Sequence, residues 1–139
     1  MRSVILDADL YIDWIHTGLH EQLMLGRQVV RYLSTVVLLE LQAGALSRSV
    51  ATAVEDLYRN YSRMRRLLAP TPETYWRAGP VLRTLTVKHG LDMRGRFRLV
   101  NDGLLALSSR QVGATVMTRN ERDFRLIQRV APFALVVVS

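Results

Sequence analysis

The chain has 139 residues, 49% hydrophobic and 22% charged, a composition typical of one globular domain spanning residues 1–139. It has no Cys, which excludes disulfides, thiolate zinc sites and cysteine nucleophiles. The net charge is +7, and every basic residue except Lys88 is Arg. Because a guanidinium group makes planar bidentate contacts with phosphate, this surplus favours a polyanionic partner, although genomic base composition explains it equally well.

No segment resembles a targeting or membrane-spanning sequence. The apolar stretch 4–14 is broken by three Asp residues, which the apolar core of a signal peptide would not contain. The longest apolar runs, 36–39 and 133–138, are far shorter than the roughly 20 residues needed to cross a bilayer. We therefore expect a cytoplasmic protein without a membrane partner.

The hydrophobic pattern predicts strands that alternate with helices. In chain order we expect a strand at 3–6, a helix at 9–17, a strand at 31–34, helices at 36–46 and 49–68, a short strand at 67–70, a helix at 71–89, a loop at 93–98, a helix at 99–112, a strand at 115–118, a short helix capped by Asn120 and a strand at 134–138. Strands that are apolar along their whole length are typical of a parallel sheet covered on both faces. The expected fold is therefore three-layer α/β/α with a central, mainly parallel sheet.

Four acidic residues occupy informative positions in this pattern. Asp7 directly follows the first strand, and Asp123 lies just after the strand at 115–118. Ligand sites in such sheets lie at the carboxyl ends of the strands. Glu40 and Asp102 lie in otherwise apolar helices, Asp102 at the opening of its helix, where burial of a carboxylate is costly without compensation. Carboxylates packed together need a cation, and an oxygen-only site suits Mg²⁺ or Mn²⁺.

Each of these acids alone also has an ordinary structural explanation. Asp7 could cap a helix, Asp102 could complement a helix dipole, and Asn120 and Asp123 are spaced as a reciprocal capping pair. Glu40 could be a solvated helix residue. The combination of the acids, rather than any one of them, indicates a metal site.

The ordered set of motifs resembles the PIN-domain nucleases of the VapC-like type, the toxins of type II toxin–antitoxin pairs. The segments that carry the resemblance are VILDADLYID, STVVLLELQAG and NDGLLALSSRQVGATVMTRNERDF, which follow one another in the family's order between residues 4 and 124. The resemblance implies a PIN-like fold and a Mg²⁺- or Mn²⁺-dependent endoribonuclease. The implied metal-binding and catalytic acids are Asp7, Glu40, Asp102 and Asp123, and the residues implied to orient them or shape the site are Ser34, Thr118 and Asn120.

Two features of the implied site stay open. Either Asp123 or Asn120 is the functional residue at the fourth position, and the reaction uses one metal ion or two. The sequence also departs from the family at Asp9, where Asn or Ser is more common, and this Asp adds negative charge near the site.

The resemblance also implies partners. The substrate is expected to be RNA, held through its phosphates, and family members usually form homodimers and are silenced by a small antitoxin protein. The candidate RNA-binding residues lie next to the proposed acids and are Arg94, Arg96, Arg98, Arg119 and Arg122. Ordinary exposed arginines would give the same pattern.

Two other functions fit parts of the sequence. A haloacid-dehalogenase-like phosphatase would explain Asp7-Ala8-Asp9 after a strand, but its chemistry needs a suitably placed Lys, and Lys88 lies at the end of a predicted helix. A catalytically inactive PIN fold that binds RNA or a partner would explain the fold alone. The discriminating prediction is that Asp7, Glu40 and Asp102 converge, with their carboxylates within bridging distance of one metal ion.

Overall fold

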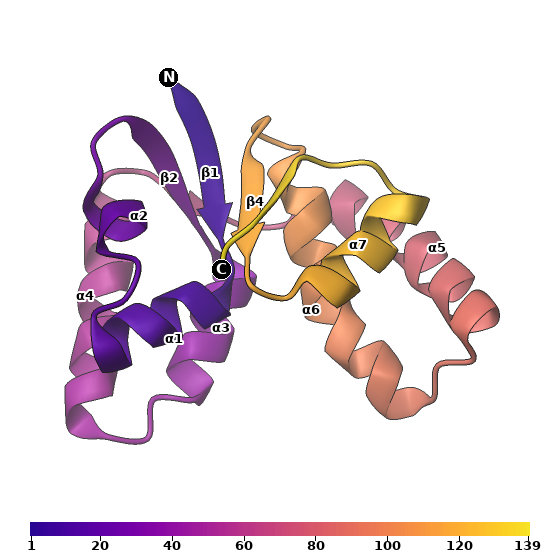
Figure 1. Ribbon diagram of the computed structural model, residues 1–139, viewed down its shortest axis with the longest axis horizontal. Helices are drawn as coiled ribbons and strands as arrows, with labels where there is room; N and C mark the ends of the chain where they lie inside the picture. Colours follow the sequence, from indigo (N-terminus) through magenta and orange to yellow (C-terminus); the bar gives the residue numbers. More distant parts are fainter.

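The computed structural model describes residues 1–139 as a five-stranded parallel sheet flanked by helices (Figure 1). The strand order is β3-β2-β1-β4-β5. The strands are β1 (Arg2–Leu6), β2 (Val29–Ser34), β3 (Leu67–Leu68), β4 (Thr115–Thr118) and β5 (Leu135–Val137). The helices are α1 (Ala8–Thr17), α2 (Glu21–Leu25), α3 (Thr35–Ala43), α4 (Arg48–Arg63), α5 (Pro72–His89), α6 (Met93–Ser109) and α7 (Glu121–Val130).

The core lies between the sheet and the helices on its two sides. Figure 1 shows α1, α2 and α4 on one side of the strands and α5, α6 and α7 on the other. Ile5, Leu33 and Val116 are fully buried in the central strands, because a parallel sheet covered on both faces has no solvent-facing side. The predicted three-layer α/β/α fold is confirmed, and no helix has the length and apolar character needed to span a membrane.

The prediction of a loop at residues 93–98 is wrong. The helix α6 begins at Met93, because the Asp92 carboxylate accepts a hydrogen bond of 2.8 Å from Gly95 N and so caps the first turn. Asp102 therefore lies in the middle of α6 and not at its opening, so it does not complement the dipole of the helix N-terminus. The short helix α2 was also not predicted, since its five residues are too few to show a periodic pattern.

Three helices begin almost directly at the carboxyl ends of the central strands. Asp7 separates β1 from α1, Ser34 ends β2 and caps α3, and Asn120 caps α7 two residues after β4. The strands β1 and β4 are held in register up to this edge, because Asp7 N donates to Met117 O at 2.9 Å. The fold therefore gathers the first turns of three helices at one edge of the sheet.

Candidate active site

Asp7 is a buried carboxylate at this edge of the sheet. Its Oδ2 accepts a hydrogen bond of 2.7 Å from Thr118 Oγ1, and its Oδ1 accepts one of 2.8 Å from Ala8 N. Burial, followed by the neighbouring charge of Asp9, raises the pKa of Asp7 from 3.8 to about 6. The two hydrogen bonds thus hold the Asp7 carboxylate in place, but they do not fully offset the effects of burial and of the Asp9 charge on its pKa.

Two further carboxyl groups, on α3 and α6, lie close enough to Asp7 for its charge to raise their pKa. Burial and then the charge of Asp7 raise the pKa of Glu40, on α3, to about 7. The same two causes, in that order, raise the pKa of Asp102, on α6, to about 8, and Glu40 is among the other acids that add to the effect. Glu40 itself is solvent-exposed, so it lies at the rim of the cluster while Asp102 lies deeper. The three residues predicted to converge therefore share one electrostatic neighbourhood.

Asn120 joins Asp102 to the fourth acid. Its Nδ2 lies 3.1 Å from Asp123 Oδ2 and 3.4 Å from Asp102 Oδ2, so one amide group spans the two carboxylates. Its Oδ1 accepts from Asp123 N at 3.4 Å, as the predicted capping role requires. Both residues considered for the fourth position thus belong to the cluster, Asp123 as an acid and Asn120 as the donor that holds it.

The donor atoms of this cluster fit a hard divalent cation. Each carboxylate atom that could bind the cation is an oxygen, the ligand type that Mg²⁺ prefers. Asp9 Oδ1 is buried without a hydrogen-bond partner, while Asp9 Oδ2 accepts from Arg119 N at 3.0 Å. However, no three acidic or His side chains converge closely enough to hold one metal ion together, so the predicted bridging distance is not met. Mg²⁺ often takes only one or two protein carboxylates and fills its other positions with water and phosphate.

Comparison with known proteins identifies the architecture. No protein-family model matches the chain, and no curated protein matches it in sequence. The fold is shared with a chain of the VapBC2 structure from Rickettsia felis bound to a promoter DNA fragment, at 20% identity over 99% of both chains and a TM-score of 0.69. It is also shared with a chain of VapBC-1 from nontypeable Haemophilus influenzae, at 21% identity over 97% of both chains and a TM-score of 0.68. A chain of VapBC-5 from Mycobacterium tuberculosis, described as a member of the VapBC family of toxin-antitoxin systems, is also similar (19%, 99% of this chain and 100% of that one, 0.63).

This chain has a PIN-like fold. The fold implied by the sequence resemblance is confirmed over nearly the whole length of the chain. The identities are low, so the likeness to these structures concerns the fold alone.

The PIN-like fold places the remaining predicted site residues differently from one another. Thr118 is fully buried and orients Asp7, as expected. Ser34 Oγ instead accepts a hydrogen bond of 3.1 Å from Val36 N, so in this structure its contribution is to begin α3.

The arginines proposed for RNA binding also differ in their surroundings. Arg94, Arg96, Arg98 and Arg122 are exposed, as a substrate contact requires. Arg119 is exposed as well (47% for its side chain), but its guanidinium group is paired with Asp13, with Nε 2.8 Å from Asp13 Oδ2. Asp13 was not among the residues predicted for the site, although its spacing of four residues from Asp9 places both on the same face of α1.

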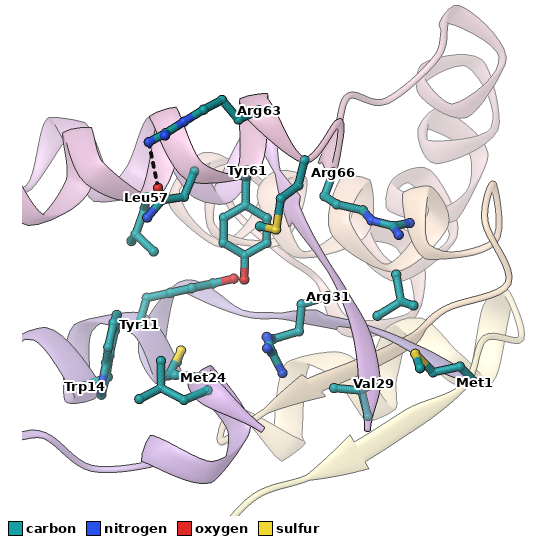
Figure 2. Close-up of a pocket in the computed structure, with 14 residues that line it drawn as sticks. Met1, Tyr11, Trp14, Met24, Val29, Arg31, Leu57, Tyr61, Arg63 and Arg66 are labelled. Carbon is teal, nitrogen blue, oxygen red and sulfur yellow. Dashed lines mark hydrogen bonds between the residues drawn. The ribbon is translucent and has the colours of Figure 1, made fainter. Parts of the chain in front are cut away.

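A separate apolar pocket of about 610 Å³ lies between α1, α2, α4 and β2. Figure 2 shows Tyr11 and Tyr61 pointing their hydroxyl groups toward each other from α1 and α4. Burial, followed by the neighbouring Tyr61, raises the pKa of Tyr11 well above its usual value, so the phenol stays protonated. Arg31, on the strand side of the pocket, donates from Nη1 to Gly26 O at 2.6 Å, and Arg63 and Arg66 also line it. The pocket therefore has mostly apolar walls and a basic margin.

Proposed function

We propose that this protein is a Mg²⁺- or Mn²⁺-dependent endoribonuclease and the toxin of a toxin–antitoxin pair. The observation that carries the proposal is the group of Asp7, Glu40 and Asp102: burial raises the pKa of all three carboxyl groups, and the charge of Asp7 further raises the pKa of Glu40 and Asp102. A fold retains mutually repelling carboxyl groups at a strand edge at a cost in stability, and perturbed groups of this kind concentrate at functional sites. The similar fold of chains from VapBC toxin-antitoxin structures supports the toxin assignment.

Each acid has a distinct role in the proposed reaction. A bound divalent cation would activate water and neutralise charge on the phosphate. Asp7 and Asp102 would hold this cation, and Asp123 would complete the acidic set through the Asn120 amide. Glu40 is exposed at the rim with a pKa of about 7, so near neutral pH it is suited to accept a proton from an attacking water.

The test of this function is cleavage of a labelled single-stranded RNA by the purified protein. We expect cleavage with Mg²⁺ or Mn²⁺, none after chelation by EDTA, and recovery when the cation is restored. Cleavage that persists in EDTA would overturn the metal assignment. Binding of RNA without cleavage would support the inactive RNA-binding alternative instead.

An antitoxin is the proposed regulatory partner. The pocket of Figure 2 offers apolar walls and three arginines, which suits an apolar segment carrying acidic residues. The antitoxin is expected to be the product of a neighbouring reading frame and to stop RNA cleavage when added in equal amount.

A homodimer is also proposed, and analytical ultracentrifugation of the purified protein would test it.

Two of the proposed RNA contacts lie on the same face of α6 as Asp102. Arg94, Arg98 and Asp102 are spaced four residues apart, so their side chains leave one face of the helix, whereas Arg96 leaves another. A phosphate chain that passes Asp102 would therefore meet Arg98 and not Arg96.

Replacement of Arg98 with Ala is expected to weaken RNA binding and to lower the slope of log Kd against log salt by about 0.7, the value for one phosphate contact on a single strand. Arg96→Ala is the matched control, since it removes the same charge from the same helix. Fluorescence anisotropy in EDTA across a salt series measures both variants without cleavage. Equal slopes for the two variants would show that Arg98 makes no specific phosphate contact.

A further inference from the structure

The segment Thr118–Asn120 contacts four acidic side chains at the candidate site, which are Asp7, Asp9, Asp102 and Asp123. Thr118 Oγ1 donates to Asp7, and Arg119 N donates to Asp9 at 3.0 Å. Asn120 Nδ2 faces Asp102 and Asp123, and Asn120 N is itself tied to Thr118 Oγ1 at 3.0 Å. These three residues are therefore in contact with four carboxylates, and a change in their conformation would alter all four contacts.

This segment is bound to two acidic residues of α1, Asp9, which accepts from Arg119 N, and Asp13. The Arg119 guanidinium group makes a two-point contact with Asp13, with Nε 2.8 Å from Oδ2 and Nη2 3.1 Å from Oδ1. Asp13 is mostly buried, with a side chain 17% exposed, and its Oδ2 also lies 2.8 Å from His20 Nε2. The carboxylate is thus held from two sides and offers Arg119 a fixed partner.

We infer that Arg119 and Asp13 are positioning residues of the active site, and that Arg119 does not serve as an RNA contact. The inference rests on the proposed nuclease function. The planar fork of a guanidinium group fixes direction as well as distance, so the contact holds Arg119 in one orientation relative to α1. Residues that orient metal-binding carboxylates commonly change metal affinity or activity by about 10- to 100-fold when they are replaced.

The inference is tested with Arg119→Gln, Asp13→Asn and the double variant. Each is expected to lower kcat by about 10-fold, with KM for RNA within about twofold, and the double variant is expected to be no worse than either single variant. Asp13→Asn is the informative change, because removing a negative charge cannot remove an attractive contact with RNA. A rise in KM for Arg119→Gln alone, with Asp13→Asn unchanged, would overturn the inference.

A second measurement does not depend on nuclease activity. Amide hydrogen exchange in EDTA is expected to show about tenfold faster exchange at the Arg119 and Asn120 N–H groups in Asp13→Asn. The matched control is Arg59→Gln, which breaks the exposed Glu55–Arg59 pair on α4 and should leave both amides and kcat unchanged. Unchanged exchange in Asp13→Asn would refute the positioning role, whereas faster exchange in a protein that cleaves no RNA would refute only the proposed function.

Discussion

Replacement of Asp7 with Asn is expected to lower the rate of cation-dependent RNA cleavage by about 100-fold or more, because the variant lacks a charged ligand at the centre of the cluster. The amide has nearly the same shape: its Oδ1 can still accept from Ala8 N, and its Nδ2 can donate to Thr118 Oγ1, which reverses the direction of that hydrogen bond. Since it also removes a buried charge, the metal-free variant should be at least as stable as the parent at pH 8. Initial cleavage rates and thermal unfolding in EDTA measure the two effects separately.

The matched control is Asp56→Asn, which makes the same chemical change at an exposed position on α4. It should cleave RNA at the rate of the parent. If Asp7→Asn is well folded and cleaves at the parental rate, Asp7 is not a metal ligand.

The metal-free protein is expected to lose stability as the pH rises from about 4 to about 8. The Asp7 carboxyl has its pKa raised from 3.8 to about 6 in the folded state, so the folded protein binds this proton more tightly than the unfolded chain does. The free energy of unfolding therefore falls as Asp7 ionises, by about 3 kcal/mol in total at 1.36 kcal/mol for each pKa unit. Asp102 extends the fall toward pH 8, and the exposed Glu40 adds less because water screens its charge.

Urea unfolding in EDTA at pH 5, 6.5 and 8 measures this dependence, and Asp102→Asn should flatten it above pH 6.5. Added Mg²⁺ is expected to raise the melting temperature more at pH 8 than at pH 5, because a protonated carboxyl group is a poor ligand. Stability that stays constant or rises between pH 5 and pH 8, in both the parent and Asp102→Asn, would contradict the clustering of these acids.

The sequence was sufficient to predict the layers of the fold and to single out Asp7, Glu40 and Asp102, whose role in a metal site stays a prediction. Apolar runs placed β1 and β4, and the position of Asp7 after β1 followed from the rule for strand ends. Glu40 and Asp102 stood out because each lies among apolar residues, which is a property of composition that needs no coordinates. The resemblance to PIN-domain nucleases correctly implied the fold.

The contacts among these residues could not be predicted in the same way. The start of α6 depends on the Asp92 cap, whose signal was weakened by Gly95 and the flanking arginines. The pairing of Asp13 with Arg119 joins residues 106 positions apart, and such a contact follows from the packing of α1 against β4 rather than from local pattern. Arg119 was therefore predicted to contact RNA, whereas in the structure its guanidinium group pairs with Asp13.

The nearly direct passage from strand to helix at the site edge limits how this protein can evolve. One residue separates β1 from α1, none separates β2 from α3, and two separate β4 from α7. Because each residue turns an α-helix by about 100°, one insertion at such a junction would swing every later side chain of the first turn to a new face. Variation is thus easier away from these junctions, such as at the exposed side chains in the first turns of α6, where charge can change without moving the acids.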